Sequence, residues 1–365
     1  MEDGGRHLER QQRLEGTMAA AGWIMTWMVG LWFSAVLVVF AQLEQSQFAA
    51  LLAFRGSILE DPEGVLEHWS VDKDPCDWRT GELEEEFGNK LTPSDIHSGV
   101  TCDADGRRII AISLRNDGLR GRIPKEIAFL DHLEYLDLDS NHFEGNIPPE
   151  IQGLKKLRVL DLGRNGRLTG SLPAELGQLV SLEAMDLAGN QLTGPIPDSF
   201  QQLQNLTYLR LGRNQLTGPV PAFFAKLVKL EYLLLHANNF SGAIPSSLGL
   251  LSNLKQLALS NNELTGTIPL TVAQNLKNLE LLTVYNNSGL CGQQYHYDTL
   301  PFSDGGTGAG RLSGTNIGRA CPSDLPCSPQ ADVDRNCEFL ASYDASLCSN
   351  ELLSSLCATT CELCQ

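Results

Sequence analysis

The sequence predicts a solenoid, a stack of similar coils in which each coil contacts only its neighbours. A unit of 24 residues, twice extended to 25, occurs eight times between residues 109 and 292. Eight coils exceed the roughly three that a solenoid needs to bury its own faces. One polar position recurs in every unit and is occupied by Asp117, Asn141, Asn165, Asn190, Asn214, Asn238, Asn262 and Asn287.

Each unit predicts a short strand, a polar turn and a tight bend. In the unit that begins at Leu133, Leu136 and Leu138 alternate with outward-facing residues, as in a strand buried on one side. Asn141 is expected to turn its amide into the core and to pair with backbone groups of neighbouring coils. Gly145 permits the bend that follows, because glycine tolerates a positive φ. These positions are therefore expected to be structural.

Composition argues against several classes of function. The 365-residue chain has 27 basic and 44 acidic residues and a formal charge of −17. It therefore lacks the excess of positive charge that binding to nucleic acid or to anionic lipid requires. It also lacks the G-x-S-x-G, H-E-x-x-H and P-loop signatures of common enzymes. We expect neither an enzyme nor a cofactor nor a metal site.

The N-terminal segment predicts export. Residues 19–41 are uncharged, largely apolar and long enough to span a bilayer as a helix. Basic residues flank this segment only on its N-terminal side, which keeps that end cytosolic. Residues 1–18 are then a cytosolic end or the n-region of a signal. Cleavage before Gln42 and retention as a signal anchor are both open, as are starts at Met1 and Met18.

The expected localisation is therefore secreted or cell surface, with a single-pass signal anchor as the membrane-bound form. Three N-x-S/T sequons fit an exported chain, because such sites receive N-linked glycans in the secretory pathway. They predict glycosylation at Asn205, Asn239 and Asn286.

The repeat resembles the plant-type leucine-rich repeat, whose unit is L-x-x-L-x-L-x-x-N-x-L-x-G-x-I-P. The resemblance covers residues 109–292, with residues 287–292 similar to the C-terminal capping motif of that family. It implies a right-handed, curved superhelix with short parallel strands on its concave face.

Residues 42–108 resemble the N-terminal cap of the same family. The resemblance implies a helix and a disulfide between Cys76 and Cys102. Near-helical spacing predicts that this helix uses Phe48, Leu51, Leu52 and Leu59 to cover the first coil. Residues 79–97 form an acidic insert between the two cysteines. We expect a solvated loop there.

Composition changes after the repeats. Residues 293–320 predict a linker, because they are rich in glycine, serine and threonine. Residues 321–365 resemble the small disulfide-rich ShK-toxin-like module in their C-x3-C-x2-C ending. The resemblance implies the disulfides Cys327–Cys364, Cys337–Cys357 and Cys348–Cys361, and Cys76–Cys102 and Cys291–Cys321 then use all ten cysteines. Because residues 297–365 contain no lysine, we expect a structural or adhesive role rather than toxin activity. A zinc site is the less favoured alternative, because the thiolate spacing is poor.

Outward positions of the strands are expected to line the concave face, where a rigid surface could bind a ligand. One column places Asp137, Asp161 and Asp186 about 4.8 Å apart. The carboxylates of this column are either solvated or bound by a basic partner. Aromatic and basic side chains follow in later coils. The candidate ligand-binding residues are Tyr135, Asp137, Asp161, Arg164, Asp186, Tyr208, Arg210, Tyr232, His236 and Tyr285.

Together these features predict an extracellular recognition module. The resemblance implies a receptor-like protein without a kinase domain, which binds a protein, peptide or glycan and signals through a separate co-receptor. The alternative is a secreted enzyme inhibitor or cell-wall-associated protein resembling the polygalacturonase inhibitors. Use of the aspartate column would favour this alternative. Neither hypothesis involves nucleic acid, and each involves a membrane only through residues 19–41.

Overall fold

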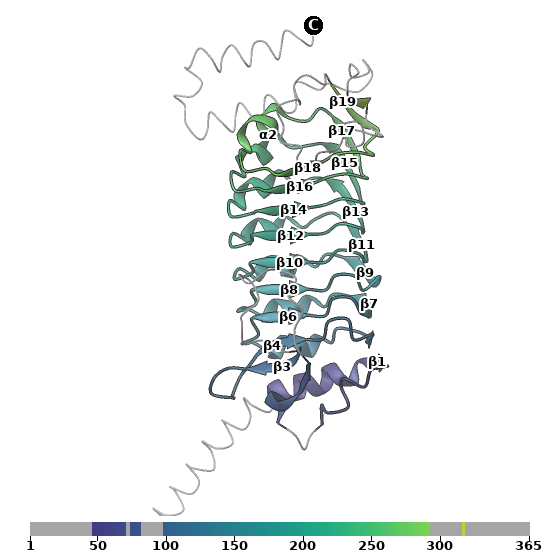
Figure 1. The fold of residues 1–365 in the computed structure, drawn as a ribbon, viewed down its shortest axis with the longest axis vertical. Coiled ribbons are helices and arrows are strands. Elements are labelled where there is room, and N and C mark those ends of the chain that lie inside the picture. The colour runs from purple at the N-terminus through teal and green to yellow at the C-terminus, as the bar shows by residue number, and fades with distance from the viewer. Residues whose placement is uncertain (1–45, 71–73, 82–97, 293–315, 318–365) are drawn as a thin grey trace, which may run out of the picture. The chain divides into compact units, whose positions relative to one another are not determined.

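The computed structural model describes residues 46–70, 74–81, 98–292 and 316–317. The chain divides into two compact units, of which the first holds residues up to 169 and 173–184, and the second holds residues 170–172 and those from 185 onward. Each unit is a stack of coils, and the expected repetition of short parallel strands is confirmed (Figure 1). Within the described ranges, no helix has the length and hydropathy to cross a bilayer. Residues 1–45 and 321–365, including the predicted membrane segment and cysteine-rich module, lie outside those ranges.

In the first unit, two sheets and a series of 3-10 helices form the coils. The main sheet contains β2 (Arg79–Gly81), β3 (Ser98–Cys102), β4 (Ile109–Ser113), β6 (Tyr135–Asp137) and β8 (Val159–Asp161). The second sheet contains β1 (Ile58–Glu60), β5 (Arg120–Gly121), β7 (His142–Asn146) and β9 (Arg167–Ser171). The helices are η1 (Pro75–Asp77), η2 (Lys125–Phe129), η3 (Pro149–Gly153) and η4 (Ala174–Gln178). The division between the units falls within β9 and β10 (Ala184–Asp186).

The second unit repeats this arrangement. Its main sheet contains β12 (Tyr208–Arg210), β14 (Tyr232–Leu234), β16 (Gln256–Ala258) and β18 (Leu281–Thr283). Its second sheet contains β11 (Gln191–Gly194), β13 (Gln215–Pro219), β15 (Asn239–Ala243), β17 (Glu263–Gly266), β19 (Gly289–Gly292) and β20 (Asn316–Ile317). The connecting helices are η5 (Asp198–Gln202), η6 (Ala222–Lys226), η7 (Ser246–Leu250) and α2 (Leu270–Asn275). Figure 1 shows β12, β14 and β16 stacked along one side of the coils, and β13, β15 and β17 along another.

The asparagine ladder holds adjacent coils together as expected. Asn238 Oδ1 accepts a hydrogen bond from the backbone N–H of Leu216, at 3.0 Å. Its Nδ2 donates to the carbonyl oxygens of Leu211 and Leu235, at 3.0 and 3.1 Å. The amide is buried, so these bonds satisfy backbone groups that water cannot reach. The same contacts recur at Asn214 and at other ladder positions.

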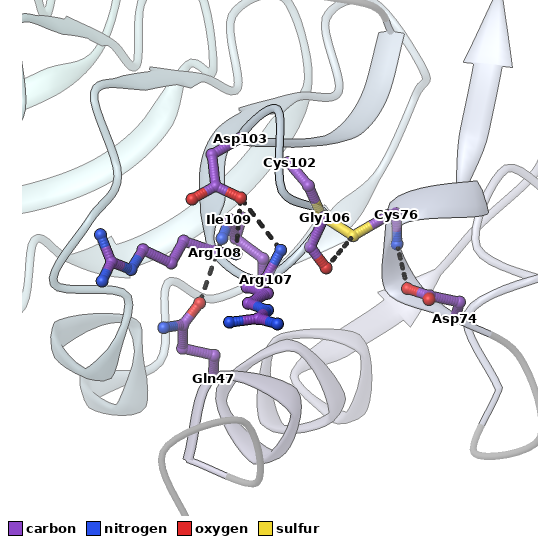
Figure 2. Close-up of a disulfide and its surroundings, with 9 residues drawn as sticks. All are labelled: Gln47, Asp74, Cys76, Cys102, Asp103, Gly106, Arg107, Arg108 and Ile109. Carbon is purple, nitrogen blue, oxygen red and sulfur yellow. Dashed lines mark hydrogen bonds between the residues drawn. A yellow bond between two sulfur atoms is a disulfide. The ribbon is translucent and has the colours of Figure 1, made fainter. Parts of the chain in front are cut away.

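A helix over residues 46–56 caps the first unit. Figure 2 shows Gln47 on this helix beside the start of β4, where its Oε1 accepts a hydrogen bond from the N–H of Ile109 at 3.1 Å. The expected disulfide joins Cys76 to Cys102. Trp78 and Trp69 stack with ring centroids 5.1 Å apart, and both are buried. An aromatic core therefore supports the cap behind the disulfide.

Three local expectations require correction or completion. The helix buries Leu51, but Leu59 lies in β1 and is 63% exposed, because the helix ends before it. The acidic insert does not begin as a loop, since residues 79–81 form β2 and pair antiparallel with β3. Residues 316–317, in the segment predicted as a linker, form β20 beside β19.

Candidate ligand-binding face

The main sheet places the candidate residues in aligned columns. Its outward positions are the first and third residues of each three-residue strand, together with the second and third residues after the strand. In the first unit, Asp137 pairs in register with Asp161. In the second unit, Tyr208 pairs with Tyr232, and Arg210 pairs with Leu234. The columns expected from the repeat are therefore present in each unit.

The aspartate column is buried, which corrects the expectation of a solvated surface. Asp137, Asp161 and Asp186 are at most 3% exposed. Each Oδ1 accepts a hydrogen bond from the backbone N–H two residues later, at 3.0, 2.9 and 2.8 Å respectively. These carboxylates therefore close the turn after each strand, which is a common structural use of aspartate. Tyr135 is also only 4% exposed, and its hydroxyl donates to Asp137 Oδ2 at 3.4 Å.

Arginine side chains of the same chain form ion pairs with buried carboxylates on this face. Both carboxylate oxygens of Asp139 accept hydrogen bonds from the Arg164 guanidinium, and Arg115 Nε lies 3.5 Å from its Oδ2. Burial raises the pKa of Asp137 to about 6, although the N–H of Asp139 and the charge of Arg115 oppose the shift. In the second unit, Arg210 donates to Asp186 Oδ2 at 3.0 Å. The sequence signal was present, because each arginine lies 24 or 25 residues, one coil, from its acid.

Two tyrosines form the aromatic part of the face in the second unit. The rings of Tyr208 and Tyr232 lie 5.6 Å apart between centroids and are tilted by 44°. Both side chains are half-buried, unlike Tyr135. Lys255 Nζ lies 5.9 Å from the centroid of Tyr232 and 2.7 Å from Glu231 Oε2. The strands fix the ring positions, so the pair presents a preorganised apolar contact.

His236 follows β14, and its ring lies against Gly212, which follows β12 in the preceding coil. A Cβ atom added to Gly212 would approach His236 Cε1 to 2.6 Å, so only glycine leaves room for the ring. Burial, followed by the charges of Arg210 and Arg213, lowers the pKa of the imidazole. Its Nδ1 is buried and has no hydrogen-bond partner among the described residues. Tyr285 lies two coils further along the same outward position and is half-buried.

A row of side chains with alternating charge runs beside the main sheet in each unit. This charge ladder was not predicted from the sequence. In the first unit, Arg158 donates to both carboxylate oxygens of Glu183 and lies 3.9 Å from Glu134. In the second unit, Lys255 forms an ion pair with Glu231. The hydrogen bond from Lys255 to Glu231 raises the pKa of Lys255, and the charge of Glu280 adds to this shift. These residues precede their strands at one-coil spacing, so the repeat period could have identified them. These ion pairs link adjacent coils, so we interpret the ladder as stabilising the alignment of the coils and not as a ligand-binding site.

The predicted glycosylation sites are sterically accessible. Asn205, Asn239 and Asn286 are exposed, and Asn239 lies in β15 of the second sheet. A glycan on Asn239 would leave the main sheet uncovered, whereas Asn286 is at an outward position just after β18. No group of three or more His, Cys, Asp or Glu side chains within the described ranges is arranged to hold a metal ion.

Comparisons with protein families agree with this architecture. A leucine-rich repeat region model matches residues 162–301, and a leucine rich repeat model matches residues 131–192. A leucine rich repeat N-terminal domain model matches residues 44–80. The class of protein defined by the fold is therefore a leucine-rich repeat solenoid.

Individual relatives are plant receptors. The chain is 39% identical over 93 residues to the LRR receptor-like serine/threonine-protein kinase FEI 2 of Arabidopsis thaliana, a match that covers 25% of this chain and 12% of the relative. The LRR ectodomain of the Arabidopsis thaliana receptor kinase GASSHO1/SCHENGEN3, in complex with CASPARIAN STRIP INTEGRITY FACTOR 2, is 31% identical with a TM-score of 0.58. This match covers 75% of this chain and 33% of that one.

A third relative is the ectodomain of the Arabidopsis receptor kinase HAESA, in complex with an IDA peptide hormone ligand. It is 27% identical, with a TM-score of 0.52, over 70% of this chain and 44% of the other. The first curated relatives are matched over only about a tenth of their own length. This chain accordingly shares the ectodomain fold of plant leucine-rich repeat receptors.

Proposed function

We propose that this chain is a receptor-like extracellular recognition module that binds a peptide segment across the main sheet of its second unit. The observation that carries the proposal is the half-exposed Tyr208–Tyr232 pair, followed by Arg210 and His236. Tyrosine and arginine on a rigid surface are the residues most enriched among binding hot spots. Two structural relatives in complex with their partners support a peptide or protein ligand.

The enzyme-inhibitor alternative loses the feature that would have favoured it over a receptor. That feature was an aspartate column free to bind a basic partner. Asp137 and Asp161 are buried, and Asp186 already binds Arg210. The face that remains available is therefore aromatic and basic. A glycan ligand has no comparable support.

A peptide selection tests the proposal. The full chain, produced in a secreting eukaryotic cell, is panned against a random peptide library displayed on phage. We expect Tyr208→Ala with Tyr232→Ala to weaken the selected peptides by about 30-fold or more, because truncating a hot spot costs about 2 kcal/mol or more. Both tyrosines lie on the surface of the repeat, so the thermal unfolding curve should change little.

The matched control is Gln215→Ala with Thr217→Ala, two exposed residues on the second sheet. It should bind the peptides as the unmodified chain does. Failure to select any peptide, or equal loss in both double variants, would contradict the proposed function.

A further inference from the structure

The main sheet of the second unit carries no carboxylate at its outward positions from β12 to β18. This is unusual in a chain whose formal charge is −17. The charged side chains at these positions are Arg210 and Arg213, and His236 is the titratable group between them. The acidic side chains that directly precede these strands are Glu231 and Glu280, and Glu231 is bound by Lys255. The local charge of the face is therefore positive against a negative background.

The two arginines differ in how their charge is used. Arg210 binds Asp186 and its side chain is 27% exposed, so its charge is largely neutralised within the chain. Arg213 is exposed and forms no ion pair with any described residue. Its backbone has a φ of 56°, in the left-handed region that non-glycine residues rarely adopt. The coil that carries Tyr208 therefore also presents one exposed cation.

His236 supplies a polar atom at the same corner. Its ring is held over Gly212, and its Nδ1 has no hydrogen-bond partner among the described residues. Nδ1 is enclosed within the protein, so only the opposite ring nitrogen, Nε2, can face a ligand. The imidazole lies in the field of Arg210 and Arg213. The positive charge of these two arginines favours an anionic group over a cationic or apolar one.

We propose that Arg213 and His236 bind an acidic side chain, Asp or Glu, of the peptide whose apolar part packs on Tyr208 and Tyr232. This inference rests on the proposed function and specifies its ligand. Carboxylate–arginine hydrogen bonds are charge-assisted and directional, and they would fix the register of a peptide along the sheet. Because the whole chain is acidic, the attraction is local, and a short peptide fits it better than a strongly acidic protein.

The same phage selection tests this proposal, because displayed peptides are fused through their C-termini and offer only side-chain carboxylates. We expect Asp or Glu at one fixed position of the selected peptides. A synthetic amidated copy should bind about tenfold more tightly than its Asp→Asn or Glu→Gln analogue. Arg213→Gln should weaken the acidic copy by a similar factor and leave the amide analogue unchanged, the signature of a direct pair.

Arg122→Gln, which removes an exposed arginine of the first unit, is the matched control and should have no effect. Selected peptides without a fixed acid, whose binding depends on the tyrosines but not on Arg213, would overturn this inference and leave the proposed function standing. Equal sensitivity of the acidic and amide copies to Arg213→Gln would also overturn it.

Discussion

At the scale of single residues, the ladder position shows why asparagine is used. An asparagine amide both donates and accepts, so it satisfies an N–H of one coil and carbonyl oxygens of two. Asp117 occupies the same position in the first coil, and an ionised carboxylate can only accept. Its Oδ2 is buried without a partner among the described residues. Burial, followed by the charges of Asp61 and Glu63, raises its pKa to about 6.

We predict that Asp117→Asn stabilises the protein at neutral pH. In the unfolded chain this carboxyl ionises near its ordinary value, but in the folded chain it ionises only near pH 6. Its favourable contribution is therefore complete below the ordinary pKa and is lost as the pH rises through about 6. The group is part-exposed, so the gain from the variant should be only about 1 kcal/mol.

Urea unfolding midpoints at pH of about 7 and about 4 measure this effect. The difference between the variant and the unmodified chain should shrink at the lower pH. A difference of the same size at both pH values would show that ionisation of Asp117 is not its cause.

At the scale of the repeat element, a backbone feature recurs just before the ladder position. Non-glycine residues adopt a positive φ there in most coils, including Ala237 at 56° and Asn261 at 57°. Gly189 occupies the equivalent place in another coil. Asparagine tolerates this conformation, but alanine pays the steric cost of its Cβ. The repeat therefore stores a small strain at Ala237.

We predict that Ala237→Gly raises the thermal stability slightly, by about 0.5–1 kcal/mol. Relief of the left-handed strain should exceed the entropy that glycine adds to the unfolded chain. Differential scanning calorimetry of the full chain measures the change. Ala273→Gly in α2 is the control and should destabilise, because glycine is unfavourable inside a helix. Destabilisation by both variants would rule out strain at Ala237.

The repeat period made most of the fold predictable. Leucine and asparagine columns follow from spacing alone, because each coil repeats the environment of the last. The burial of Asp137 and Asp161 could not be predicted in this way. It depends on the backbone N–H groups of the turn after each strand, at Asp139 and Gly163, whose positions the spacing does not reveal. Leu59 was misassigned because helical spacing does not reveal where a helix ends.

At the scale of the whole molecule, a cysteine at the end of the repeats bears on how the rest of the chain is attached. Cys291 is disulfide-bonded. The other two cysteines in the described ranges, Cys76 and Cys102, are bonded to each other. β20 lies beside β19, with Asn316 opposite Cys291. Cys321 is the first cysteine after β20.

We predict that Cys291 pairs with Cys321. Proteolysis of the unreduced, secreted chain followed by mass spectrometry should recover a peptide pair joined through these two residues. A link from Cys291 to Cys327, Cys337 or any later cysteine would show that the C-terminal segment follows a different pairing.

Hydrogen exchange tests the central claim most directly, because it locates a bound peptide without relying on a substitution. The full chain is compared with and without a peptide selected as described above. We expect slowed amide exchange at residues 208–213 and 232–237, on the main sheet of the second unit. Protection confined to residues 215–219 and 239–243 of the second sheet would contradict the claim that the main sheet binds the ligand.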